Sequence, residues 1–86
     1  MYSKKYILKN VEEFNRHNPV YDDMLGDICY LAYLKVGEHG WFLHQTKDQF
    51  DLPHRINTSV VEDVDYTSDN RVIVTTQNTR FTFEAI

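Results

Sequence analysis

The chain has 86 residues, of which 42% are hydrophobic and 14% aromatic, with three glycines, two prolines and one cysteine. This length fits one small domain over residues 1–86 and excludes a two-domain enzyme or a TIM barrel, while the aromatic content excludes a disordered tail. The single cysteine excludes an internal disulfide and any zinc site built from several cysteines.

Charge is distributed unevenly along the chain. Nine Lys and Arg residues against thirteen Asp and Glu residues give a net charge of -4. Residues 22–69 hold ten acids and three bases, a balance of -7, whereas residues 1–21 balance to +2 and residues 70–86 to +1. Domains that bind nucleic acid usually have a pI above about 9. An acidic middle repels phosphate and attracts basic protein surfaces.

The N-terminal segment, residues 1–20, predicts a short strand or turn at 5–9 followed by a short helix. Asn10 is a suitable N-cap with Glu13 three residues later, and Pro19 would end the helix. The apolar residues of this segment follow the i, i+4, i+7 spacing of a helical stripe: Ile7, Val11, Phe14.

Residues 28–86 predict an antiparallel β-sheet. A turn around Gly26 precedes the strongest strand, Ile28–Val36, in which both faces are apolar. One face would meet the core, and the N-terminal helix or a partner chain would cover the other. A hairpin turn at 37–40 leads to a returning strand at 41–44.

After a polar loop, a third strand is expected from Arg55 to Tyr66, with a bulge near 59–61 where the period-two pattern slips. Two tight turns follow, a three-residue loop ending at Asn70 and a two-residue turn at 77–78. These turns set a register, which pairs Tyr66 with Val72, Val64 with Val74, Val74 with Phe81, Val72 with Phe83 and Arg71 with Glu84.

The expected fold is therefore mainly β with one short N-terminal helix. Five short strands joined by tight turns predict an antiparallel meander that curls into a small, partly open SH3-like barrel. A helix packed on an open five-stranded sheet is the alternative.

Candidate chemistry is sparse, and we expect no enzyme. His39, His44 and His54 lie in or beside predicted loops, but their spacing matches no compact metal motif, so solvated loop histidines are expected. Cys29 has apolar neighbours rather than the cationic surroundings that activate a thiol, which predicts a buried structural cysteine. We therefore predict no catalytic, metal-binding or cofactor-binding residues.

A protein partner is the favoured interpretation of the acidic and aromatic residues. Aromatic anchors and carboxylates are typical of surfaces that occlude a basic protein, and the residues predicted for that role are Trp41, Tyr33, Asp22, Asp23, Glu62, Asp63 and Asp65. The alternative is nucleic-acid binding by stacking on a small barrel, with a platform formed by Tyr33, Trp41, Phe42, Lys35 and Arg55. Edge strands and two-faced apolar strands are also compatible with a homodimer.

No targeting segment is visible. The apolar run Tyr6-Ile7-Leu8 between lysines is too short for a signal peptide, and no run approaches the roughly 20 apolar residues that span a bilayer. We expect a cytoplasmic protein that does not contact a membrane, in a compartment where the thiol of Cys29 stays reduced.

The C-terminal half carries a resemblance. The pattern His54-Arg55-Ile56-x-Thr58-Ser59-x-Val61, followed by Val72-x-Val74-x-Thr76-x-Asn78-Thr79-x-Phe81-x-Phe83, resembles short uncharacterised proteins of Gram-positive bacteria and their phages or mobile elements. The resemblance covers residues 36–84. It implies an accessory protein that acts by binding, such as one that blocks a defence or regulatory protein, and it implies no catalytic residues.

Overall fold

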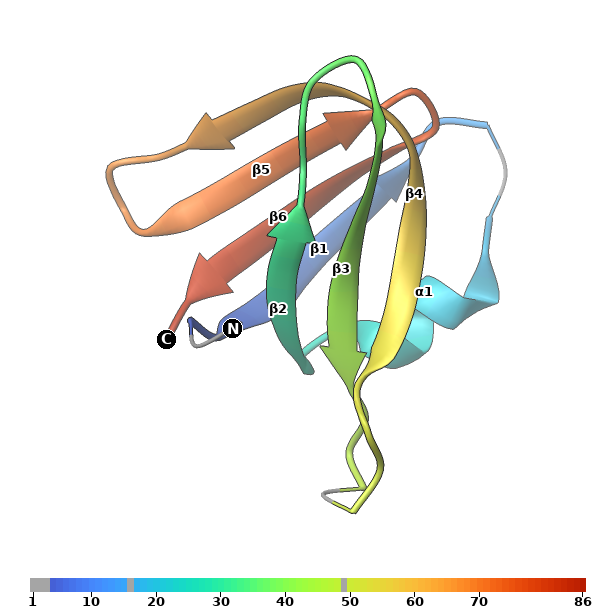
Figure 1. The fold of residues 1–86 in the computed structure, drawn as a ribbon, viewed down its shortest axis with the longest axis vertical. Coiled ribbons are helices and arrows are strands. Elements are labelled where there is room, and N and C mark those ends of the chain that lie inside the picture. Colours follow the sequence, from blue (N-terminus) through green and yellow to red (C-terminus); the bar gives the residue numbers. More distant parts are fainter. Residues whose placement is uncertain (1–3, 16, 49) are drawn as a thin grey trace.

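A computed structural model describes residues 4–15, 17–48 and 50–86. Six strands form a closed antiparallel barrel in which each strand pairs with the next and the last pairs with the first (Figure 1). One six-residue helix lies between the first two strands in the sequence. In chain order the elements are β1 (Tyr6–Glu13), α1 (Pro19–Met24), β2 (Ile28–Tyr33), β3 (His39–Gln45), β4 (His54–Tyr66), β5 (Arg71–Thr76) and β6 (Thr79–Ala85).

The helix predicted after Asn10 is wrong, because that segment belongs to β1. A bulge between Leu8 and Asn10 shifts the strand register, so Leu8 and Val11 both pair with buried phenylalanines of β6. Ile7, which pairs with Glu84, faces out, so the helical spacing of Ile7, Val11 and Phe14 does not mark one buried face. The real helix starts where the predicted one was expected to end: Asn18 accepts a hydrogen bond from the Val20 amide (3.1 Å) as the N-cap, and Pro19 occupies the first turn, as proline favours.

The extra strand changes the architecture from five strands and a partly open barrel to six strands and a closed one. β1 pairs with β6 along almost its whole length and with β2 near its start, so it joins the two ends of the meander. The short helix lies at one end of the barrel (Figure 1). It does not cover the outer face of β2, although the two apolar faces of that strand predicted the helix as one of two possible covers.

The second half of the sheet has the predicted register. β4, β5 and β6 pair Tyr66 with Val72, Val64 with Val74, Val74 with Phe81, Val72 with Phe83 and Arg71 with Glu84. The loop residue Asn70 adopts the left-handed conformation with φ 65°, and register shifts in β4 flank residues 59–61. The apolar face ends before Tyr66, however, because that side chain is 71% exposed.

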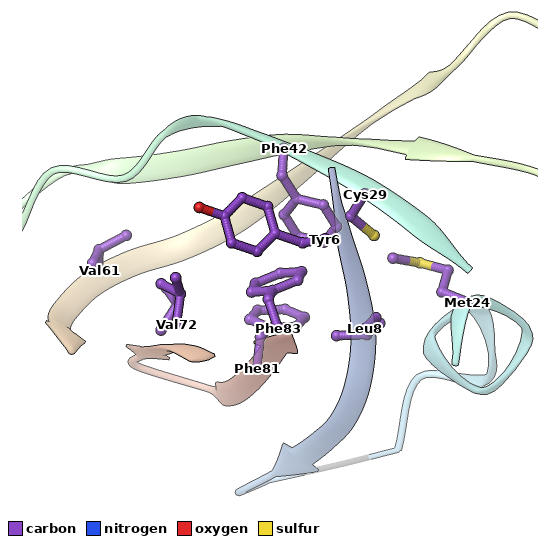
Figure 2. Close-up of a cluster of buried hydrophobic side chains, with 10 residues drawn as sticks. Tyr6, Leu8, Met24, Cys29, Phe42, Val61, Val72, Phe81 and Phe83 are labelled. Carbon is purple, nitrogen blue, oxygen red and sulfur yellow. The ribbon is translucent and has the colours of Figure 1, made fainter. Parts of the chain in front are cut away.

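Aromatic rings fill the barrel. Phe42 meets Phe81 and Phe83 edge to face, with ring centroids 5.4 and 5.2 Å apart, an arrangement that adds electrostatic attraction to burial. Met24 reaches in from α1 toward Leu8 and Cys29 (Figure 2). The buried core residues are Tyr6, Leu8, Met24, Cys29, Phe42, Val61, Val72, Val74, Phe81 and Phe83.

The closing seam between β1 and β2 is short. Two residue pairs align across it, Tyr6 with Cys29 and Ile7 with Ile28. The turn before β2 extends the seam, because the Gly26 amide donates to the Leu8 carbonyl (2.8 Å) and the Leu8 amide donates to the Asp27 carbonyl (3.2 Å). Gly26 has φ +84°, a conformation that favours glycine.

The side chain of Asp27 ties this seam to the next strand. It is 8% exposed, and its two oxygens lie 2.9 Å from His44 Nε2 and 2.9 Å from Lys47 Nζ. Burial alone would raise the pKa of Asp27, but the hydrogen bonds from His44 and Lys47 outweigh it, so the pKa lies below its ordinary value of 3.8. A buried carboxylate is tolerated because both oxygens are satisfied.

Removal of the buried ring of Phe42 should destabilise the barrel far more than removal of an exposed aromatic ring. We expect Phe42→Ala to lower the free energy of unfolding by about 4 kcal/mol, because it removes a fully buried aromatic side chain. Phe50→Ala is the matched control, since Phe50 is 85% exposed, and should change that energy by less than about 0.5 kcal/mol. Urea unfolding measures both, and equal losses would contradict the placement of the two rings.

Replacement of the seam carboxylate should destabilise the barrel in a pH-dependent way. A carboxyl whose folded pKa is depressed stabilises the fold above its unfolded pKa and loses that contribution as the pH falls through the folded pKa. We expect Asp27→Asn to cost about 2 kcal/mol at pH 7 and the difference from the wild type to shrink below about pH 4. Urea unfolding across this pH range measures it.

Asp65→Asn, at an exposed position on β4, is the control and should leave the free energy of unfolding within about 0.5 kcal/mol at pH 7. A constant gap between Asp27→Asn and the wild type down to about pH 2 would show that the carboxylate charge of Asp27 is not what holds the seam.

Candidate functional site

The outward side chains of β2, β3 and β4 form two aligned rows. One row consists of Tyr30, Leu43 and Arg55, and the other consists of Tyr33, Trp41 and Asn57. Alternation along β3 and β4 places Trp41, Leu43 and Arg55 outside the barrel, while Phe42 points in. On β2 the register shift between Leu31 and Tyr33 lets Tyr33 face out as Tyr30 does. We call the outward set the aromatic face: Tyr30, Tyr33, Trp41, Leu43 and Arg55.

Arg55 stacks on the indole of Trp41. Its guanidinium carbon lies 4.3 Å from the centroid of the ring, a cation–π distance. The Arg55 Nε also donates to Asn57 Oδ1 at 2.9 Å, which fixes the plane of the guanidinium. The centre of the aromatic face therefore carries an ordered cation over an apolar ring.

Tyr33 joins the aromatic face to a carboxylate. Its ring is 41% exposed, and its hydroxyl donates to Glu38 Oε1 at 2.9 Å. Glu38 also pairs with Lys35 at 3.3 Å. The hydrogen bond with Tyr33, and then the one with Lys35, lowers the pKa of Glu38, and the hydrogen bond to Glu38 raises the pKa of Tyr33.

The β2–β3 turn brings this group beside the acidic half of β4. The Gly37 amide donates to the Val61 carbonyl, and the Val61 amide donates to the Glu38 carbonyl, each at 2.8 Å. Glu62 and Asp63 come directly after Val61, and the register shift between Val61 and Asp63 leaves both exposed. Two of the predicted aromatic residues and the predicted β4 carboxylates thus lie at one end of the barrel, with exposed Asp65 two residues further along β4.

The other two predicted carboxylates lie elsewhere. Asp22 and Asp23 are on α1, at the end of the barrel away from the β2–β3 turn (Figure 1). Asp22 Oδ2 lies 2.7 Å from His17 Nε2, and the Asp23 carbonyl accepts from Lys47. The structure therefore does not bring all five predicted acids onto one face.

The three candidate histidines do not converge. His44 is not a solvated loop residue, as we had expected, but a buried strand residue that bonds Asp27. His39 Nδ1 lies 3.0 Å from the Thr58 carbonyl, and His54 is exposed at the start of β4. Within residues 4–15, 17–48 and 50–86, no three His, Cys, Asp or Glu side chains could hold a metal ion together.

Cys29 is the buried structural residue that its neighbours predict. It has no exposed surface, and burial, reinforced by the charge of Asp27, raises its pKa to about 12. A catalytic thiol needs the opposite shift.

The predicted nucleic-acid platform loses a member. Phe42 is fully buried in the core, so it offers no surface to a base, and Lys35 is paired with Glu38. Sequence reasoning did not name Tyr30 and Leu43 of the aromatic face. Strict alternation in the predicted strand puts Tyr30 and Tyr33 on opposite faces, and the register shift between Leu31 and Tyr33 brings them to the same side.

Comparison of the chain with protein-family models, with curated proteins and with solved structures finds no match. The resemblance of residues 36–84 to short phage and Gram-positive proteins stays a prediction. In the part of the chain that the structure describes, no helix is long and apolar enough to cross a membrane.

The thiol should be inert in the folded protein. We expect Cys29 to resist iodoacetamide at about pH 8, because it is buried and the thiolate is the reactive species, and to react fully in denaturant. Mass spectrometry of the intact protein counts the added groups. Rapid labelling of the native protein would contradict the buried position and reopen thiol chemistry.

Proposed function

We propose that this protein is a non-catalytic binding protein that occludes a basic surface on a protein partner. One observation carries the proposal: Tyr33 pairs with Trp41 across β2 and β3 and bonds Glu38, and the β2–β3 turn bonds Val61, which directly precedes Glu62 and Asp63. Binding surfaces combine aromatic anchors that are desolvated at the centre with charges at the rim.

The mechanism is charge pairing around an aromatic centre. The carboxylates Glu62, Asp63 and Asp65 would meet Lys or Arg side chains, while Tyr33 and Trp41 exclude water. Such pairing speeds association and selects a basic partner. If the partner binds nucleic acid, these carboxylates compete with its phosphates. A cytoplasmic accessory protein of a phage or mobile element fits this role and the resemblance of residues 36–84.

Charge reversal at two places on the barrel tests the proposal. The partner is first captured from cells that naturally carry the gene and identified by mass spectrometry, and then purified. We expect Glu62→Lys with Asp63→Lys to weaken its binding by about 100-fold in calorimetry, since each lost or reversed contact costs about 1 kcal/mol or more, and added salt to weaken the wild-type complex.

Asp22→Lys with Asp23→Lys is the matched control. It changes the net charge by the same amount at the other end of the barrel, so it should reduce affinity by less than about threefold. Similar losses of affinity in the two double variants would show that net charge alone causes the effect and would reject a defined acidic surface.

A second proposal, single-stranded nucleic-acid binding, is supported by the stacked Arg55 and Trp41, because bases stack on such aromatic residues beside cations. A fluorescent oligonucleotide at about 50 mM salt tests it. Binding lost on Trp41→Ala would favour it over a protein partner, and no binding would reject it.

A further inference from the structure

A second surface lies in the loop between β3 and β4, at the opposite end of these strands from the β2–β3 turn and Glu38. This loop extends beyond the barrel at the end where α1 lies (Figure 1). It presents the two most exposed large apolar side chains among the described residues, Phe50 at 85% and Leu52 at 84%. Large apolar side chains at such exposure gain stability only when something else covers them.

Hydrogen bonds join the described residues on the two sides of the loop. Gln45 Nε2 donates to the carbonyls of Asp51 (3.0 Å) and Asp48 (3.4 Å). The Thr46 hydroxyl donates to Asp51 Oδ2 at 3.1 Å, and the Phe50 amide donates to Asp48 Oδ1 at 2.9 Å. Since the bonds form in the free protein, presenting the tip to a partner costs little ordering entropy.

The charge of the loop restricts what can cover the tip. Lys47 is turned back to the barrel, where it bonds the carboxylate of Asp27 and the carbonyl of Asp23. Asp48 and Asp51 remain exposed around the tip. Carboxylates beside the apolar tip repel the phosphates of nucleic acids and anionic lipids, and two copies of the tip would repel each other for the same reason.

We propose that the exposed side chains Phe50 and Leu52 of the β3–β4 loop form a docking element that inserts into an apolar pocket with a basic rim on a second protein. The two side chains project from the loop into solvent, and Lys or Arg side chains around the pocket would meet Asp48 and Asp51. This surface is separate from the aromatic face and does not depend on the function proposed for it.

Photo-crosslinking identifies the occupant directly. The protein is produced with p-benzoylphenylalanine in place of Phe50, in cells that naturally carry the gene, and the crosslinked peptide is mapped by mass spectrometry. We expect the peptide to lie in an apolar pocket bordered by Lys or Arg on one protein. Against that purified protein, Leu52→Ser should weaken binding at least about tenfold, as loss of an anchor residue does.

Two controls separate this surface from the others. Ile86→Ser removes another exposed apolar side chain (68% exposed), and Tyr33→Ala alters the aromatic face; neither should change the affinity of the pocket protein for the loop. Thermal unfolding should be unchanged in Leu52→Ser, because the side chain is exposed, so a loss of binding would not reflect unfolding.

Several outcomes would overturn the docking proposal. They are crosslinks to lipid or to a second copy of this chain, no crosslink at all, equal affinity of wild type and Leu52→Ser, and flotation of the wild type with phosphatidylcholine vesicles that Leu52→Ser abolishes. Loss of binding in Tyr33→Ala alone would support the aromatic face and reject the loop.

Discussion

Closure of the barrel depends on the two residues before β2. β1 must bond β6 on one side and β2 on the other, yet it aligns with β2 over two residue pairs. Gly26 and Asp27 extend that seam through their backbone to Leu8, and the Asp27 carboxylate ties it to His44 on β3 and to Lys47 beyond β3. A closed sheet has no free edges to aggregate, so this short segment decides whether the sheet is a barrel or an open meander.

The same closure positions both proposed binding surfaces. Because Asp27 is bonded to His44, β2 and β3 lie in a fixed register, with Cys29 and Phe42 inside and Tyr33 beside Trp41 outside. Lys47 anchors the start of the β3–β4 loop at the same point. A hydrogen bond to a buried carboxylate adds modest net stability, whereas loss of one partner is costly. Its value here is positional: it fixes where the surfaces lie.

Sequence reasoning correctly predicted the part of the fold that local chemistry determines. Turn residues such as Asn70 set the register of β4, β5 and β6, because a hairpin is defined by its own few residues. It misplaced the helix because the spacing of Ile7, Val11 and Phe14 fits a helical stripe, although Ile7 and Val11 lie on opposite faces of β1. The bond between Asp27 and His44 joins residues 17 apart, and no local pattern indicates it. For the candidate site, alternation placed Tyr33 and Trp41 on strands, but only the closed barrel shows that α1 carries Asp22 away from Glu62.

Ion pairs explain why the negative charge gathers at the ends of the barrel. On the outer side of β1, β5 and β6, Arg80 meets Glu12 and Arg71 meets Glu84, each at 3.3 Å, so these two arginines are neutralised by local carboxylates. Among the ion pairs of the described residues, none includes the acidic side chains of β4 or those of the β3–β4 loop: Glu62, Asp63, Asp65, Asp48 and Asp51. The excess of acids in residues 22–69 is thus divided between the two surfaces. The β2–β3 turn and the β3–β4 loop, beside which these two groups of carboxylates lie, are at opposite ends of the barrel (Figure 1), so the unpaired charge is separated along the molecule.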